Sequence, residues 1–334
     1  MRAFLLILFA TIAGLLASPC YAICFQYLSI PDDAGRPIEI GIWYPSTSLA
    51  GPITVGMIAQ NAALDGEIDG SGLPVVIFSH GSAGWFGDRS ETAQLLAQQG
   101  MLAVSLTYPG DNYKDSSDKV IRKLTSRPVV TSRVIDYLLN GWSGKDHLDE
   151  SKIGFYGFSA GGFTGLVELG GVPNWTLFSQ HCTADPTEPV CTQGGAAFLS
   201  GPKAAAMPNS TWHHDSRIKA AFLVSPGYSF AFEASSLQKM KPPVELWGGS
   251  NDEFVPFSTN VHYLIEHMPD VLQTREVENA RHYSFLRPCS AAMQAKNPEI
   301  CSDLPGFDRL AFQQDLNSEL VRFFQSELVK KGHN

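Results

Sequence analysis

Three side chains that can together perform nucleophilic catalysis occur along the chain in the order serine, aspartate, histidine. Ser159 lies in the stretch GFSAG at 157–161, a G-x-S-x-G pattern, while Asp252 and His282 each follow a predicted strand. A serine hydroxyl is a poor nucleophile until a base removes its proton, and the base needs an acid to hold its tautomer. We therefore predict that His282 activates Ser159 and that Asp252 orients His282.

The residues around Ser159 predict a sharp turn between a strand and a helix. The apolar run KIGFYGF precedes the serine, and a segment with helical character follows it. Glycines at 157 and 161 let the strand and the helix pass closely, and such a turn holds the serine in a strained backbone conformation. An ordinary capping serine at a helix start is the alternative, because the bare pattern often occurs by chance.

The predicted acid and the predicted base each have a competitor. Glu253 is the neighbour most able to replace Asp252, but Asp252 has the better position at the strand end. His80 ends another strand and precedes a glycine, and we expect it to brace the adjoining loop rather than act as the base. We therefore keep Asp252 and His282 as the predicted pair.

Backbone amides are needed to stabilise the negatively charged oxygen that forms when a serine attacks an acyl carbon. The run VVIFSHGSAGW predicts a strand ending in a glycine-rich turn, from which the amide of Ser82 can point at the site. The amide of Ala160, next after Ser159, is the second predicted donor. A plain glycine-rich turn is the alternative, although it falls where such a donor is needed.

These residues imply no metal or organic cofactor. His213 and His214 lie in an irregular part of the chain and have no third partner at metal-ligand spacing beyond Asp215. We expect no metal site there.

Short apolar runs alternate with amphipathic segments, a pattern typical of a largely parallel sheet covered by helices. The predicted strands lie near 25–30, 38–44, 74–79, 102–107, 152–157, 218–225, 243–248 and 273–279. The predicted helices lie at 89–99, 127–140, 160–169, 258–268 and 309–330. We predict an α/β fold with a mostly parallel eight-stranded sheet, whose first two strands form an antiparallel edge. The last helix has apolar residues at helical spacing, including Leu310, that we expect in the core.

Residues 171–216 break this alternation. They are rich in Pro, Gly, Thr, Trp and His. We predict an inserted lid or loop beside the carboxyl edge of the sheet. A decorative insertion is the alternative, since long loops cost little entropy.

The N-terminal stretch MRAFLLILFATIAGLLASPCYA has one arginine, an apolar run and a small residue at its end, as in a secretory signal peptide. We expect cleavage after Ala22, a single domain at 23–334 and a secreted or periplasmic location. No later run approaches the roughly 20 apolar residues that cross a bilayer, so we expect a soluble protein without a stable membrane anchor. Because the formal net charge is -9 over 334 residues, we expect no nucleic acid partner.

The cysteines beyond the signal peptide fall into two local pairs and one single residue. Cys182 and Cys191 bracket a short segment, and Cys289 and Cys301 bracket another. In an oxidising compartment we expect these pairs to form disulfides and Cys24 to stay unpaired. Free buried thiols are the alternative.

With these motifs in order, the chain resembles the α/β-hydrolase superfamily from about residue 25 to 330. More narrowly it is similar to the dienelactone-hydrolase-like and platelet-activating-factor-acetylhydrolase-like serine esterases. The stretches that carry the resemblance are SHGSAGW, LAQQGMLAVSLTYPGDN, SRVIDYLL, KIGFYGFSAGG, DSRIKAAFLVSPG, WGGSNDEFVP and ARHYSFL. Dienelactone hydrolases have cysteine where this chain has Ser159, so their lactone activity is not carried over.

The predicted activity is hydrolysis of carboxylic esters through an acyl-enzyme on Ser159, with a small-molecule or lipid-like ester as substrate. A polyester, a phospholipid acyl bond or a peptide bond is the alternative target of the same side chains. The chain resembles secreted polyester hydrolases in its possible disulfide near His282. A non-catalytic binding protein on a hydrolase fold is a further alternative, although such proteins usually lose a member of the triad.

Overall fold

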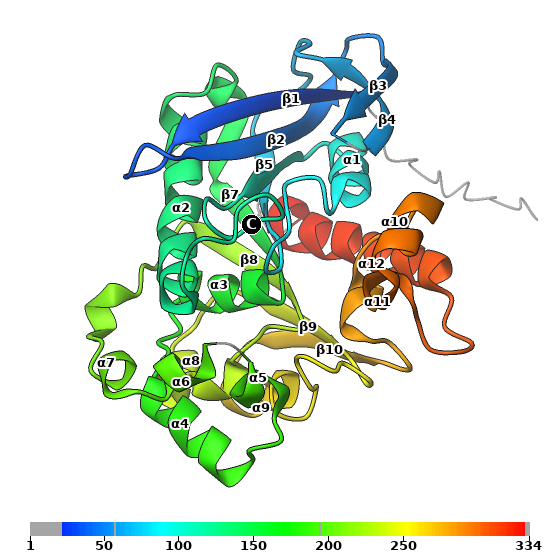
Figure 1. Ribbon diagram of the computed structural model, residues 1–334. Helices are drawn as coiled ribbons and strands as arrows, with labels where there is room; N and C mark the ends of the chain where they lie inside the picture. The colour runs from blue at the N-terminus through cyan, green and yellow to red at the C-terminus, as the bar shows by residue number, and fades with distance from the viewer. Residues whose placement is uncertain (1–21, 57, 194, 331–334) are drawn as a thin grey trace, which may run out of the picture.

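The computed structural model describes residues 22–56, 58–193 and 195–330, and the predicted signal peptide lies outside this part except for Ala22. A ten-stranded sheet, in the order β10-β9-β8-β7-β5-β6-β2-β1-β4-β3, runs through the molecule (Figure 1). The strands are β1 (Ala22–Pro31), β2 (Pro37–Ser46), β3 (Gly51–Val55), β4 (Ile58–Leu64), β5 (Leu73–Ser79), β6 (Leu102–Thr107), β7 (Leu148–Phe158), β8 (Ile218–Val224), β9 (Val244–Gly249) and β10 (Val271–Val277).

The central strands are parallel and buried on both faces. Pairing is parallel from β10 through β9, β8, β7 and β5 to β6. Every residue of β5 is buried, which explains why its sequence is almost wholly apolar. Successive side chains alternate between faces, so Val75 and Ile77 pack in one cluster while Val76 and Phe78 pack in the other. The predicted mostly parallel α/β architecture is confirmed.

The prediction of eight strands is wrong, because the hairpin of β3 and β4 adds two more. The first, GPITV, has five residues and begins with Gly and Pro, and the second, IAQNAAL, consists mainly of Ala, Asn and Gln. Most of these residue types are depleted in strands, so both segments give a weak strand signal. The predicted antiparallel pair, β1 and β2, is present. It is not the edge of the sheet, however, because β4 pairs with β1 on its outer side.

Helices cover both faces of the sheet. One face packs against α1 (Ser90–Gln98) and α12 (Arg309–Phe324), and the other packs against α2 (Val120–Asn140), α3 (Ala160–Glu168) and α9 (Val261–His267). All five predicted helices are therefore present. Leu310 does not reach the core, since it is 61% exposed in the first turn of α12.

One helix boundary was predicted wrongly. The sequence analysis placed its start at 127. The helix instead begins at Val120 and continues through Pro128. It is buried from Leu124 onward on one side, and this packing outweighs the hydrogen bond that proline cannot donate.

The predicted insertion at 171–216 is largely helical rather than irregular. It contains α4 (Trp175–Ala184), α5 (Pro189–Thr192), α6 (Ala196–Leu199) and α7 (Pro202–Ala205), which gather below the sheet in Figure 1. Two further short helices, α10 (Ala291–Lys296) and α11 (Pro298–Cys301), lie at the other side of that view. Within the described ranges, no helix has both the length and the apolar character that crossing a bilayer requires.

Both expected cysteine pairs are disulfide-bonded, Cys182 to Cys191 in the insertion and Cys289 to Cys301 across α10 and α11. Cys24 is free and buried in β1. Disulfides persist mainly in oxidising compartments, so the two bonds are consistent with a location outside the cytoplasm.

Candidate active site

Ser159 occupies a tight turn between β7 and α3. Its backbone has φ 55° and ψ -115°, a left-handed conformation that costs a non-glycine residue free energy. A Cβ atom at Gly161 would collide with the carbonyl oxygen of Ser79, and one at Gly157 would collide with the carbonyl oxygen of Gly161. The two glycines are therefore steric requirements of the turn, as the sequence predicts.

The three side chains singled out by the sequence lie in one hydrogen-bonded row. The Nε2 atom of His282 is 3.0 Å from the Oγ atom of Ser159, and its Nδ1 atom is 2.8 Å from Oδ2 of Asp252. A carboxylate oxygen can only accept, so Nδ1 carries the proton and Nε2 is left to accept from the serine hydroxyl. This arrangement can draw the proton from Ser159.

Asp252, not Glu253, faces the imidazole ring. The Oδ1 atom of Asp252 accepts hydrogen bonds from the backbone amides of Phe254 and Val255, at 3.0 and 2.7 Å. These bonds hold Asp252 in the turn after β9 and aim its second oxygen at His282. Glu253 has another partner set: it accepts from Arg281 at 2.6 Å and from the backbone amide of His282 at 3.2 Å.

The ring of His282 is enclosed by aromatic side chains. It lies 4.8 Å from the ring of Phe158, 5.5 Å from Phe254 and 5.5 Å from Tyr283, measured between ring centroids. His282 itself is 4% exposed. The residue begins a short 3-10 helix at His282–Phe285, so the orientation of the ring is held by both its neighbours and its backbone.

The two predicted oxyanion donors line the same cavity as Ser159 and His282. Ala160 is the first residue of α3, where a backbone amide has no acceptor within the helix. Ser82 lies in the turn after β5, next to Ala83, which has φ 58°. Neither of these two backbone amides is therefore used in a hydrogen bond of a helix or of the sheet.

His80 braces this turn, as expected from the sequence. Its Nδ1 atom donates to the carbonyl oxygen of Gly81 at 2.5 Å, and its Nε2 atom accepts from the backbone amide of Tyr108 at 3.2 Å. Burial and the nearby charge of Arg127 lower the pKa of His80 to about 3. The ring is thus neutral, and both its nitrogens are engaged in positioning the loop.

Sequence reasoning missed Arg127, the cation that holds the turn with the predicted oxyanion donor Ser82. Its guanidinium is fully buried and donates to the carbonyl oxygens of His80 and Gly81, at 2.6 and 3.1 Å. It also donates twice to Oδ2 of Asp111, at 3.0 and 2.8 Å. A signal was present, because Arg127 interrupts the apolar stripe of α2 between Leu124 and Val134.

Asp111 balances the charge of Arg127. Its side chain is 2% exposed and also pairs with Lys123 at 2.9 Å. Burial alone would raise the pKa of Asp111, but the charges of Arg127 and Lys123 outweigh it and lower the pKa to about 2. The carboxylate therefore stays ionised throughout the ordinary pH range.

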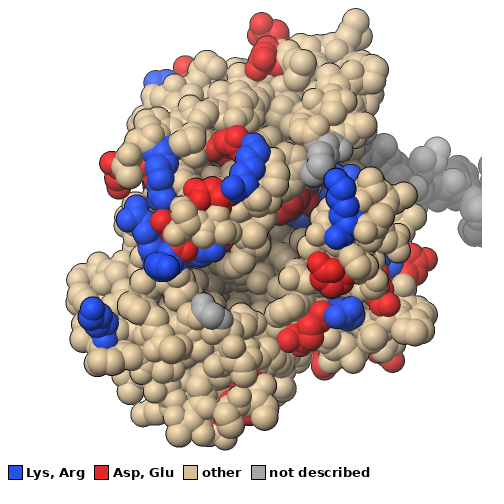
Figure 2. Space-filling model, in the orientation of Figure 1, with Lys and Arg blue, Asp and Glu red and all other residues tan. Residues whose placement is uncertain are grey.

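A cavity of about 470 Å³ opens beside Ser159. Its lining is mainly apolar and aromatic, and Figure 2 shows a face hollowed near its centre where uncharged side chains predominate. The apolar part of the lining consists of Trp85, Tyr113, Phe158, Val190, Tyr228, Phe254, Val255, Tyr283, Leu286, Met293 and Ile300. Such a lining favours a ligand with a substantial apolar portion.

Two carboxylates also line the cavity, Asp88 and Glu188. Asp88 accepts a hydrogen bond from the backbone amide of Trp85 at 3.0 Å. Burial raises the pKa of Asp88 to about 7, and this effect outweighs the hydrogen bond and the nearby arginines. Neither residue was singled out from the sequence.

The residues weighed for a metal site have other partners. His213 contacts the hydroxyl of Ser132 at 3.0 Å, and His214 contacts the carbonyl oxygen of Val167 at 2.5 Å. Asp215 pairs with Arg217 at 2.6 Å. Over the ranges that the structure describes, no three His, Cys, Asp or Glu side chains are grouped to hold a metal ion.

Comparison with known proteins identifies the fold. No protein-family model matches the chain, and no curated protein sequence matches it. Among solved structures, it is similar to a ferulic acid esterase from Streptomyces cinnamoneus, with a TM-score of 0.64 and 14% sequence identity over 92% of this chain and 90% of that one. At this identity the likeness shows the fold alone: a mostly parallel sheet flanked by helices, as in that esterase.

Proposed function

We propose that this protein is a serine hydrolase that cleaves carboxylic esters. The observation that carries the proposal is the row of hydrogen bonds from Asp252 through His282 to Ser159, which ends at a cavity large enough for an organic ester. The likeness to an esterase supports it, as does the resemblance of the motifs to dienelactone-hydrolase-like and platelet-activating-factor-acetylhydrolase-like esterases.

In the proposed mechanism, His282 takes the hydroxyl proton of Ser159 while Oγ attacks the acyl carbon. The electron pair of the carbonyl moves onto its oxygen, where the amides of Ser82 and Ala160 stabilise the charge. Collapse of this intermediate expels the alcohol, which receives the proton from His282. Water, deprotonated by His282, then attacks the acyl carbon. When the acyl–Oγ bond breaks, His282 returns the proton to Ser159 and the acid is released.

The substrate that we propose is a small or lipid-like ester with an apolar or aromatic group. The aromatic and aliphatic lining of the cavity supports this class. The esterase to which the fold is similar is named for an aromatic acid. We also propose that residues 1–22 are a signal peptide, that residues 23–334 form one domain, and that the mature protein is periplasmic or secreted.

An ester panel tests the proposed function. Purified protein should hydrolyse para-nitrophenyl esters from acetate to palmitate, and methyl ferulate as an aromatic probe, with a maximum somewhere in the series. Ser159→Ala should remain folded and lose activity by a factor on the order of 10⁶, as in other serine triads.

Ser82→Ala is the matched control for that substitution. It removes a serine hydroxyl from the same cavity but keeps the backbone amide that the mechanism uses, so the rate should change little. Retention of a tenth of the activity by Ser159→Ala would contradict the proposal.

A further inference from the structure

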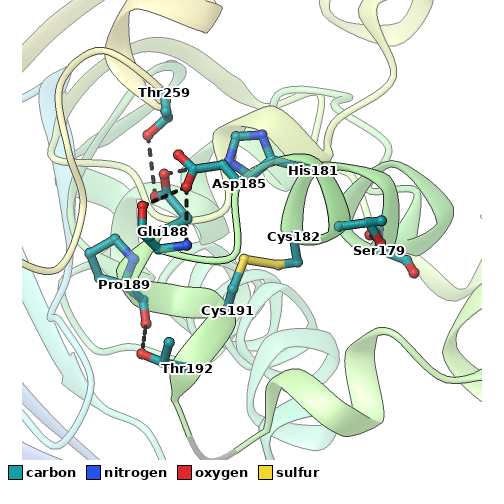
Figure 3. The surroundings of a disulfide bond; sticks show 11 residues. Ser179, His181, Cys182, Asp185, Glu188, Pro189, Cys191, Thr192 and Thr259 are labelled. Carbon is teal, nitrogen blue, oxygen red and sulfur yellow. Dashed lines mark hydrogen bonds and ion pairs between the residues drawn. A yellow bond between two sulfur atoms is a disulfide. The ribbon is translucent and has the colours of Figure 1, made fainter.

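One wall of the cavity is built by the segment that the Cys182–Cys191 disulfide closes. Glu188 and Val190 both lie between these cysteines and both line the cavity. Glu188 is 3% exposed and Val190 is 8% exposed. Figure 3 shows Glu188 between the disulfide and Thr259. The insertion therefore contributes directly to the space beside Ser159 and is not decorative.

Glu188 connects this segment to the chain that follows Asp252. The hydroxyl of Thr259 donates to Oε1 of Glu188 at 3.2 Å, and Nε2 of His181 lies 3.4 Å from Oε2 (Figure 3). Thr259 precedes Asn260, which lines the cavity and accepts from the backbone amide of Ser229 at 3.1 Å. A buried carboxylate thus joins the insertion to the segment that leads from the predicted acid to α9.

The cavity wall draws little rigidity from its own secondary structure, although Val190 packs with the core. Val190 belongs to α5, which has four residues, and a helix of this length has no stability of its own. The backbone of Glu188 is part of the same small unit, since its carbonyl oxygen accepts from the amide of Cys191 at 2.9 Å. The disulfide closes the two ends of the segment, while Glu188 fixes its middle. Loss of the Glu188 contacts should therefore free Val190.

We propose that Glu188 is a positioning residue for substrate selection, which holds Val190 against the distal part of a long ester. This inference rests on the proposed esterase function and adds which part of the protein selects the substrate. An acetyl group fills a small part of a cavity of about 470 Å³, so it does not reach a wall built outside the serine turn. A long acyl or aryl group extends farther and gains binding energy from that wall.

The test compares two esters within each variant. We expect Glu188→Ala and Val190→Ala each to lower kcat/KM for para-nitrophenyl octanoate about tenfold, the scale for one lost apolar contact. kcat/KM for the acetate should change less than twofold. The readout is kcat/KM for the octanoate divided by kcat/KM for the acetate, because this ratio does not depend on the fraction of folded enzyme. Thr259→Val, which removes the hydroxyl partner, should lower the ratio in the same direction.

Asp185 provides the matched control. It lies in the same disulfide-closed segment, and its carboxylate accepts from the amide and the hydroxyl of Thr187 at 3.0 and 2.6 Å. It does not belong to the cavity lining. Asp185→Ala should leave the ratio unchanged. Glu188→Gln, which keeps the shape and an acceptor oxygen, should restore most of the ratio lost in Glu188→Ala.

The double variant Glu188→Ala/Val190→Ala decides whether Glu188 acts through Val190. If it does, the double variant should show the same ratio as either single variant. Four results would overturn the inference. In the double variant, the two single-variant losses in the ratio could multiply; in the single variants, both esters could lose kcat/KM equally. Asp185→Ala could change the ratio, or the wild-type protein could hydrolyse the acetate but not the octanoate. A wild-type protein that hydrolyses no ester would instead overturn the proposed function.

Discussion

Replacement of Arg127 by methionine should damage stability and activity through two separate contacts. The first contact is the ion pair with Asp111, whose loss leaves a buried carboxylate with Lys123 as its remaining cation. The second is the hydrogen bond to the carbonyl oxygen of Gly81. That carbonyl belongs to the same planar peptide unit as the amide of Ser82, so Arg127 also fixes the direction of the predicted oxyanion donor.

The expected magnitudes follow from these contacts. Breaking a buried ion pair on one side costs about 3–5 kcal/mol, and the remaining pair with Lys123 places the loss near the lower value, at about 3 kcal/mol. Misdirection of one oxyanion donor costs up to about 10²–10³ in kcat. We therefore expect Arg127→Met to lower the free energy of unfolding by about 3 kcal/mol and kcat by about 10²-fold.

Urea denaturation and ester hydrolysis, normalised by active-site titration, measure the two effects separately. Adding Asp111→Asn to Arg127→Met removes the buried carboxylate that has lost one of its two cations, so it should recover part of the stability without recovering kcat. Arg122→Met is the control, because Arg122 lies on the same helix with a side chain that is 56% exposed, and its partner Asp118 keeps a second pair with Arg36. This substitution should change stability by less than about 1 kcal/mol. Unchanged kcat in Arg127→Met, or recovery of kcat together with stability, would refute this reasoning.

The pair also predicts how stability depends on pH. The pKa of Asp111 in the folded protein is about 2, below the value of about 3.9 for an unfolded aspartate. The stabilisation is therefore complete above about pH 4 and is lost as the pH falls toward 2, by about 2 kcal/mol. Arg127→Met should flatten this part of the stability profile, and an unchanged acid limb would contradict the assignment.

Three further predictions concern other parts of the site. Asp252→Asn should reduce kcat by about 10⁴-fold, and Glu253→Gln should reduce it less; the reverse order in steady-state kinetics would make Glu253 the acid. Serine at both Cys289 and Cys301 should lower the melting temperature and turnover together, and by more than the same change in the other disulfide; unchanged values would make the bond a bystander. Because the folded-state pKa of Asp88 is about 7, its contribution to stability falls as the pH rises from about 4 to 7, and Asp88→Asn should remove that fall in thermal unfolding.

The sequence predicted the parts of the fold that depend on local composition. Every predicted strand is present. The central strands were the easiest to recognise, because a strand buried on both faces must be apolar along its whole length. The two strands that were missed, β3 and β4, have weak strand signals in their sequences, and they join the sheet only through the pairing of β4 with β1. The start of α2 was missed because tertiary packing carries the helix through Pro128.

The residues of the candidate site also include some that the sequence predicted and some that it did not. Ser159, Asp252 and His282 could be selected because motif, strand end and chain order all point to them, and the structure brings them together. Their roles in catalysis stay predictions. Arg127 and Glu188 could not be selected by motif, since each acts through partners far away in the chain. The break in the apolar stripe at Arg127 marks a buried charge, but the role of such a residue becomes visible only when the fold places it beside its partner.

Covalent labelling tests the central claim most directly. A fluorophosphonate reacts with an activated serine, and it should modify the mature protein at one site, which peptide mass spectrometry should locate at Ser159. Ester hydrolysis should disappear in proportion to the fraction labelled, and Ser159→Ala should take up no label. Absence of labelling in an active preparation, or a label on another serine with loss of activity, would contradict the claim that Ser159 is the nucleophile.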